Sequence, residues 1–129
     1  HEWDAWSAAR IVPPRIIGHE FYGEVVAVGS DVRERHVGQR VASESHVVPL
    51  DSPWLAEGLG HVAPETKILG VDIDGGFADF AAIPWWNARP TDPAVPPHLA
   101  CFQDALGNAV HTAMAGPVQG KRILITGLG

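Results

Sequence analysis

Proline and glycine divide this chain into short segments and so limit it to short strands and short helices. The 129 residues include 11 prolines and 14 glycines. Residues 84–97 alone hold five prolines. Because proline lacks a backbone N–H and disrupts helices and central strands, this stretch is expected to be irregular. Residues 46–60 combine both residue types with no sustained hydrophobic period, so we expect a long loop there.

The segments between these breaks have the patterns of strands first and of helices later. Apolar and β-branched segments bounded by turn residues predict four strands, at residues 24–28, 37–43, 66–71 and 76–83. A helical stretch is predicted to open at Pro96, with apolar residues at helical spacing up to Leu106, and a second helix from Asn108 to Met114. The apolar segment 122–126 predicts a final strand. This order favours a mostly β domain with short helices that runs into an α/β domain.

Charge and hydropathy exclude two classes of function. The formal net charge is -6 and no basic cluster appears, which argues against nucleic acid as a partner. No apolar run approaches the roughly 20 residues that a membrane helix needs, so no membrane interaction is expected. The single cysteine, Cys101, excludes an intramolecular disulfide and fits a reducing compartment, so we expect a cytoplasmic protein.

A histidine and a glutamate stand side by side after the apolar run that ends at Gly18. On a regular strand, His19 and Glu20 would point to opposite faces and could not hold one ion. At a bend after Gly18, one of them could bind a metal while the other lies next to the metal ligands without coordinating the ion. A catalytic zinc needs three protein ligands and one open position. By spacing alone, however, such a pair is more often structural or a surface pair than a metal site.

The residues around this pair match the pattern G-H-E-x-x-G-x(5)-G-x-x-V, from Gly18 to Val32. The pattern resembles the signature of zinc-containing alcohol dehydrogenases of the medium-chain dehydrogenase/reductase superfamily. More narrowly, EWDAW, ESH, ILGVDIDGGFA, GNAVHT and ITGLG follow the order and spacing of the L-threonine 3-dehydrogenase family. The resemblance implies a GroES-like catalytic domain over residues 1–118 that leads into a truncated NAD-binding Rossmann domain at residues 119–129.

The same resemblance implies one catalytic Zn²⁺ and its ligands. The histidine of the G-H-E motif binds the zinc in this family, which assigns that role to His19, and the adjacent Glu20 is a neighbouring or alternate ligand. A carboxylate just before GNAVHT supplies a further ligand, here Asp104. The remaining family ligand is a cysteine upstream of EWDAW, before the first residue of this chain. Cys101 is no substitute and is expected in the core, so we expect the chain alone to bind zinc weakly.

A second, structural zinc is expected to be absent. Family members bind it in a lobe with four cysteines, and the corresponding positions here are Pro49, Ser52, Leu55 and Ala63. None of these side chains supplies a thiolate, and a closed structural zinc site needs four suitable ligands. In place of the metal we expect either a loosely ordered loop or a small apolar cluster of Trp54, Leu55, Leu59 and Val62.

Further positions of the resemblance imply proton transfer and cofactor binding. His46 matches a family histidine near the catalytic metal and is a candidate for substrate contact or proton transfer, with an ordinary surface histidine as the alternative. Gly127 and Gly129 are the first two glycines of a G-x-G-x-x-G motif, which lets the backbone approach a dinucleotide pyrophosphate. Asn108 matches a position near the nicotinamide. We therefore expect NAD as the cofactor.

The implied reaction is NAD-dependent oxidation of a secondary alcohol, with L-threonine to 2-amino-3-oxobutanoate as the leading case. Zinc would lower the pKa of the substrate hydroxyl, and hydride would pass to the nicotinamide. One alternative is a polyol or diol dehydrogenase of the same superfamily. Another is a non-catalytic packing module, favoured by the missing cysteines, the truncated glycine motif and Gln39 where relatives usually carry Asp.

The two ends of the chain also lead to an expectation. The chain begins without Met and stops within the glycine motif. We therefore expect a fragment that is inactive as the 129-residue chain alone. Separately, we expect the full-length enzyme to be a homo-oligomer, a dimer or a tetramer.

Overall fold

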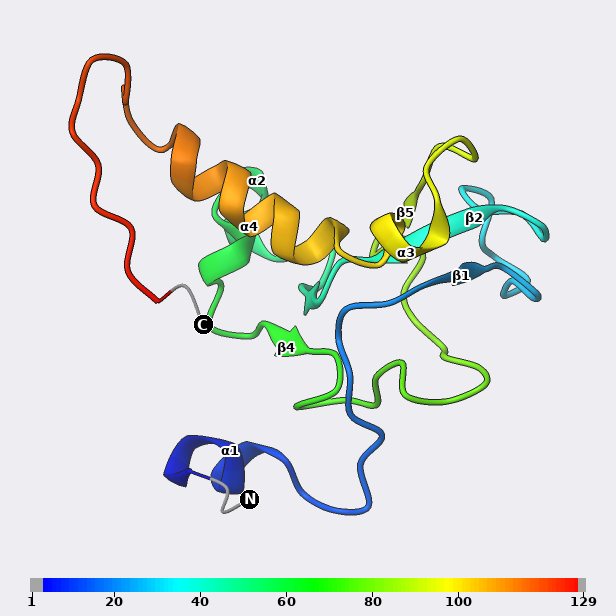
Figure 1. The fold of residues 1–129 in the computed structure, drawn as a ribbon. Helices are drawn as coiled ribbons and strands as arrows, with labels where there is room; N and C mark the ends of the chain where they lie inside the picture. Colours follow the sequence, from blue (N-terminus) through cyan, green and yellow to red (C-terminus); the bar gives the residue numbers. More distant parts are fainter. Residues whose placement is uncertain (1–3, 128–129) are drawn as a thin grey trace.

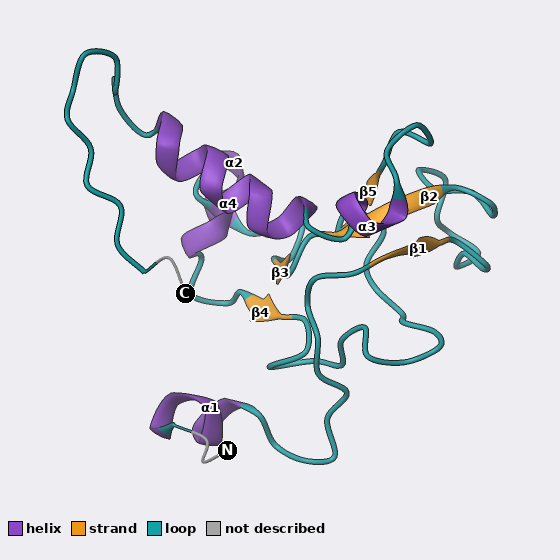
Figure 2. Cartoon of the chain, in the orientation of Figure 1, coloured by secondary structure: helices purple, strands orange, loops and turns teal. Residues whose placement is uncertain are grey.

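The computed structural model describes residues 4–127, in which short strands and helices are joined by long loops (Figure 1, Figure 2). The strands are β1 (Tyr22–Glu24), β2 (Arg40–Ser43), β3 (His46–Val47), β4 (Lys67–Ile68) and β5 (Ala88–Pro90). The helices are α1 (Ala5–Arg10), α2 (Pro53–Ala56), the 3-10 helix η1 (Gly60–Val62), α3 (Pro97–Ala100) and α4 (Gln103–Met114). Among the described residues, no helix has both the length and the apolar character of a membrane span.

The strands form two small antiparallel sheets. In the larger sheet β2 lies between β1 and β5, and Val41 of β2 is opposite Gly23 on one side and Pro90 on the other. In the smaller sheet β3 pairs with β4, with His46 opposite Ile68. Helix α4, orange in Figure 1, begins beside β2 and α3 and extends away from the sheet. The first turn of α4 therefore lies close to the ends of strands from both sheets.

The buried core follows β2, β5 and the segments after β3 and β4. Its fully or nearly buried apolar residues are Val41, Ala42, Val48, Ala63, Leu69, Val71, Ala88 and Ala100. Asn87 is fully buried among them, and its side-chain N–H groups donate to the carbonyls of Glu44 at 2.7 Å and His46 at 2.9 Å. These bonds hold the turn between β2 and β3 against β5, because buried backbone carbonyls need a donor.

One ion pair ties α1 to the turn after β4. Arg10 donates from Nε to Asp72 Oδ1 at 2.9 Å and from a terminal nitrogen to Oδ2, while the N–H of Ile68 donates to Oδ2 at 2.8 Å. Burial raises the pKa of Asp72, but these hydrogen bonds and the charges of Arg10 and Arg15 outweigh it. The net pKa of Asp72 therefore lies below the ordinary value for an aspartate.

The structure corrects several element boundaries. The predicted strand 24–28 is shifted, since β1 covers Tyr22–Glu24 and only Val25 continues the bonding, with Gln39 at 2.9 Å and Gly38 at 2.8 Å. The predicted break before Asn108 is wrong, because α4 is continuous through Gly107. One glycine costs a helix only about 1 kcal/mol, which neighbouring helix formers can offset.

Two predicted strands are wrong, and a predicted loop contains regular structure. Residues 76–83 and 122–126 form no strand, and Phe77, Phe80 and Leu124 are at least 73% exposed. Their apolar side chains were the strand signal, but a strand also needs a continuous partner for its backbone hydrogen bonds. Gly76 and Phe77 donate to the carbonyls of Gly18 and Ile17, whereas the rest of the two segments pairs with no strand within residues 4–127. The predicted loop 46–60 instead contains β3 and α2.

Candidate metal site

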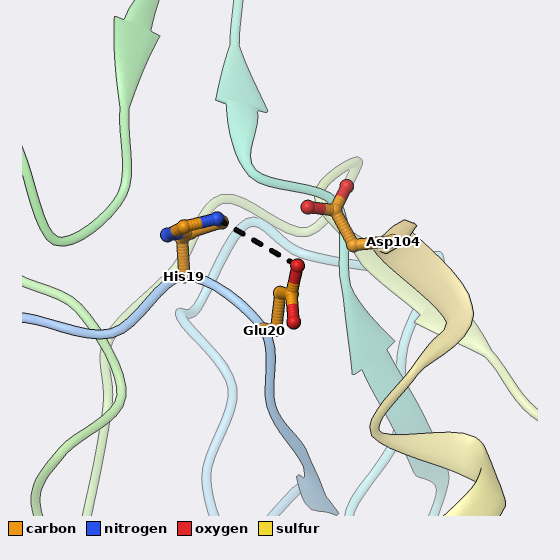
Figure 3. Close-up of side chains that lie close together, drawn as sticks. All are labelled: His19, Glu20 and Asp104. Atoms are coloured by element: carbon orange, nitrogen blue, oxygen red, sulfur yellow. Dashed lines mark ion pairs between the residues drawn. The ribbon is translucent and has the colours of Figure 1, made fainter. Parts of the chain in front are cut away.

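Three ionisable side chains from distant parts of the sequence meet at one point (Figure 3). His19 and Glu20 lie just before β1, and Asp104 lies at the start of α4. One ligand atom from each, an imidazole nitrogen and two carboxylate oxygens, all lie within 4.8 Å of one another. His19 Nε2 is 3.8 Å from Glu20 Oε1. Bonds from zinc to such atoms are about 2.0–2.2 Å long, so small side-chain rotations would bring all three to a single ion.

The bend that turns His19 and Glu20 to the same side begins at Gly18. Gly18 has φ +95°, a left-handed conformation that residues with a Cβ rarely adopt. Ser43 of β2 then holds the next residues: its hydroxyl donates to the carbonyl of His19 at 2.6 Å and accepts from the N–H of Phe21 at 3.0 Å. Residues 19–21 are therefore anchored beside the sheet without being part of a regular strand, and the alternation of side chains does not apply to them.

The backbone of residues 70–76 packs closely against the same bend. Gly75 donates to the carbonyl of Ile16 at 2.7 Å, and Gly76 donates to the carbonyl of Gly18 at 2.8 Å. A Cβ on Gly75 would lie 2.0 Å from the carbonyl oxygen of Gly18, and a Cβ on Gly70 would lie 2.6 Å from its nitrogen. Only glycine allows these segments to approach so closely, so the GG of "DIDGG" serves to pack against the metal-site bend.

Asp104 reaches the same point from the first turn of α4. Its carboxylate is half-buried, whereas the His19 and Glu20 side chains are 48% and 40% exposed. The first turn of a helix carries unpaired N–H groups and a partial positive charge, which favour a carboxylate there. Asp104 also accepts from the hydroxyl of Ser45 at 3.4 Å. The helix and the turn between β2 and β3 together orient this carboxylate.

These donors suit a divalent metal ion. One imidazole nitrogen and two carboxylate oxygens are borderline-to-hard ligands of the kind that zinc accepts, and three protein ligands leave a further position for water or substrate. The partial exposure of His19 and Glu20 keeps that side of the site accessible to solvent. The arrangement can therefore hold a metal and admit a small molecule to it.

A cavity of about 360 Å³ opens beside Asp104. Its lining includes Glu44 from the turn between β2 and β3, His46 from β3, His61 from η1, and Asn108 and His111 from α4. Cavities that bind small molecules usually begin at about 300 Å³. The predicted site residues His46 and Asn108 thus both border the space next to the candidate metal ligands.

Two histidines that were not among the predicted site residues, His61 and His111, also line this cavity. Their ring centroids are 5.6 Å apart. Ser43, Ser45 and Asn87 were likewise not identified as site residues. Serine and asparagine are common in loops, and their role follows from hydrogen bonds to residues far along the chain, which no local pattern predicts.

Other predicted positions lie away from the cluster or outside the described residues. Gly127 is exposed with φ +74°, and Gly129 lies outside the described residues. Cys101 is half-buried in the turn between α3 and α4, where its thiol donates to the carbonyl of His98 at 3.4 Å. Its placement in the core was therefore only partly right.

The lobe after β3 is held by hydrogen-bonded turns and a serine–glutamate contact. The Ser52 hydroxyl donates to Glu65 Oε1 and keeps the pKa of Glu65 below its ordinary value. Leu55 packs against Gly60, where a Cβ would lie 2.5 Å from Leu55 Cδ2. Of the predicted apolar cluster, Leu55 and Leu59 are each 38% exposed and Val62 is 56% exposed, so these residues do not form a buried core.

The chain is similar to known proteins in both sequence and fold. The family described as the alcohol dehydrogenase GroES-like domain matches residues 2–93. A curated L-threonine 3-dehydrogenase from Pyrococcus abyssi is 46% identical over 129 residues, which are 100% of this chain and 37% of the relative. The chain thus spans little more than a third of the length of that relative.

Solved structures share the fold. A short chain alcohol dehydrogenase from Escherichia coli CFT073, complexed with NADH, has a TM-score of 0.74 and 35% identity, over 80% of this chain and 31% of that chain. A thermostable alcohol dehydrogenase from Pyrobaculum aerophilum with bound cobalt and zinc has a TM-score of 0.67 and 25% identity, over 75% of this chain and 30% of that chain.

Proposed function

Because the chain belongs to the family of the alcohol dehydrogenase GroES-like domain, we propose that its protein oxidises a secondary alcohol with zinc and NAD, and that L-threonine is the substrate. The predicted GroES-like fold and the predicted resemblance to L-threonine 3-dehydrogenases are both confirmed. The observation that carries the proposal is the meeting of His19, Glu20 and Asp104 within 4.8 Å. Zinc and NADH in structures of the same fold support the two cofactors.

The proposed metal ligands are His19, Glu20 and Asp104. When bound, zinc supplies Lewis-acid polarisation of the substrate hydroxyl. The side chains that hold it come from the bend after Gly18 and from the first turn of α4, so the site depends on the packing between these two segments. Glu20, whose side chain is 40% exposed, is proposed as the ligand that moves toward or away from the ion.

His46 is the proposed proton acceptor. Conversion of a secondary alcohol to a ketone removes one hydride and one proton, and the nicotinamide supplies the hydride acceptor. His46 lines the cavity beside Asp104, its side chain is one-third exposed, and an imidazole nitrogen can accept the proton and release it to solvent. Oxidation of L-threonine in this way yields 2-amino-3-oxobutanoate, with Asn108 at the cavity wall near the proposed nicotinamide position.

Two structural proposals accompany this function. Residues 1–118 form the portion of the catalytic domain present in this chain, and residues 119–129 begin the nucleotide-binding domain, in which Gly127 and Gly129 would face the pyrophosphate. The enzyme is a homo-oligomer. Both proposals rest on the family resemblance, and a crystal structure of the longer protein with NAD tests them.

Zinc titration of the Asp104→Asn protein tests the metal site directly. Isothermal titration calorimetry with Zn²⁺ on the 129-residue chain should give one binding event, and Asp104→Asn should weaken it by at least about tenfold, because the amide oxygen carries no charge. Asp51→Asn, at an exposed position in the lobe, is the matched control and should bind zinc as the unmodified chain does. Equal affinities for all three proteins would refute the site.

Activity of the longer protein tests the substrate. NADH formation followed at 340 nm should be faster with L-threonine than with 2,3-butanediol or sorbitol at equal concentrations. Faster turnover of the diol or of sorbitol would refute L-threonine as the substrate and support the alternative polyol or diol dehydrogenase. The proposal for the metal site would not be affected.

A further inference from the structure

A buried serine lies between the proposed metal ligand Asp104 and the proposed proton acceptor His46. Ser45, in the turn between β2 and β3, is 2% exposed. Its Oγ is 3.4 Å from Asp104 Oδ1 and 3.2 Å from His46 Nδ1. Its carbonyl accepts from the N–H of Leu69 at 3.0 Å, so its backbone is held in place. A single hydroxyl thus contacts two site residues that belong to different elements.

The neighbouring glutamate decides which way the hydrogens point. Glu44 Oε1 lies 3.4 Å from His46 Nδ1 and accepts from the His46 backbone N–H at 3.2 Å. A carboxylate oxygen can only accept, so a lone pair on Nδ1 would face it unfavourably. The hydrogen of the neutral imidazole therefore belongs on Nδ1, where it has two acceptors, Glu44 Oε1 and Ser45 Oγ.

The single hydrogen of Ser45 then has one suitable acceptor. Its oxygen accepts from His46 Nδ1, and its hydrogen points to Asp104 Oδ1. In the opposite arrangement, with Ser45 donating to Nδ1, Asp104 would lose its donor and Glu44 would face a lone pair. All three contacts are satisfied only when hydrogen bonds run from His46 to Ser45 and from Ser45 to Asp104.

We infer that Ser45 is a positioning residue, which orients the Asp104 carboxylate toward the proposed metal position and, together with Glu44, keeps His46 in the tautomer with hydrogen on Nδ1. Nε2 of His46 then carries the lone pair that can accept a proton at the cavity. The catalytic meaning of this arrangement rests on the proposed function, whereas the tautomer and the contact with Asp104 are properties of the chain itself. Mutation of a residue that hydrogen-bonds to a metal ligand usually lowers metal affinity 10- to 100-fold.

The tautomer is measured by NMR. Long-range ¹H–¹⁵N spectra of the metal-free chain, at a pH where histidine side chains are neutral, distinguish the two ring nitrogens. We expect a protonated Nδ1 and an unprotonated Nε2 for His46. After Ser45→Ala we expect a larger share of the tautomer with hydrogen on Nε2, because Glu44 Oε1 is then the one remaining acceptor of the two that contact Nδ1. His46 with its hydrogen on Nε2 in the unmodified chain would overturn the inference, whether or not the chain binds zinc.

Zinc affinity gives the second readout. Ser45→Ala should weaken Zn²⁺ binding about tenfold, the lower end of the usual range, because the 3.4 Å contact is long. Ser45→Thr keeps a hydroxyl and should bind Zn²⁺ as tightly as the unmodified chain. If the extra methyl group of threonine prevents folding, Ser45→Cys, whose thiol is close to the serine hydroxyl in size, is used instead of Ser45→Thr. Ser52→Ala is the matched control, since it removes a buried serine hydroxyl that donates to a different carboxylate.

The two measurements separate the possible failures. If the unmodified chain binds zinc and Ser45→Ala binds it equally well, Ser45 is not a positioning residue and the metal site stands. If the unmodified chain binds no zinc, the proposed three-residue metal site of this chain fails, and the His46 spectra still decide the role of Ser45. Circular dichroism on each variant shows that any loss is not due to unfolding.

Discussion

The packing of Gly75 beneath the metal-site bend allows a quantitative test with Gly75→Ala. A methyl group on Gly75 would lie 2.0 Å from the carbonyl oxygen of Gly18 and 2.8 Å from the Cα of Gly70. Both neighbours are backbone atoms, which cannot rotate away as a side chain could. Ordinary contacts lie near 3.5 Å, so the two segments must separate by roughly 1.5 Å. The backbone of Gly75 is not left-handed, so the cost comes from packing alone.

The expected cost is about 3 kcal/mol of unfolding free energy. Overpacking of a tight site costs about 1–3 kcal/mol, and the displaced backbone also weakens two hydrogen bonds at about 1 kcal/mol each. These are the bonds from Gly75 to Ile16 and from Gly76 to Gly18. The same displacement moves His19 relative to Asp104, so zinc affinity should fall as well.

Urea denaturation followed by tryptophan fluorescence measures this loss, and zinc calorimetry measures the second effect. Gly107→Ala is the matched control, because a Cβ there meets nothing within 4 Å and the residue lies inside α4. That variant should gain about 0.5–1 kcal/mol from helix propensity. If Gly75→Ala costs less than about 1 kcal/mol, the close approach of these segments does not support the bend.

Two further predictions concern the residues that hold the site's surroundings. Asp72→Asn should lower stability at neutral pH by about 1–2 kcal/mol through loss of the Arg10 pair. Since the folded-state pKa of Asp72 is lowered, its contribution is present above the pKa of the unfolded chain and is lost as pH falls below about 4, so urea midpoints of the two proteins should converge there. Asn87→Leu should cost about 2–3 kcal/mol, because the buried carbonyls of Glu44 and His46 lose their donor, and it should broaden the His46 NMR signals.

Much of what the sequence predicted follows from local chemistry. The prolines and glycines predicted short elements, and the strands β2 and β4 lie within the predicted segments. His19, Glu20 and Asp104 were identified as candidate ligands by their place in motifs. The strand predictions at 76–83 and 122–126 failed because an apolar segment becomes a strand only when another strand supplies hydrogen-bonding partners.

By itself, the sequence determined which residue types are available and where the chain can bend, since Gly18 and the prolines act on their own segments. Tertiary structure alone decided that His19 and Glu20 share one side, because Ser43 from another strand holds the bend. It also decided that Asp104 joins them and that Ser45 links Asp104 to His46. Atoms so far apart in sequence converge only through the packing of several elements, and that geometry is not encoded in any single segment.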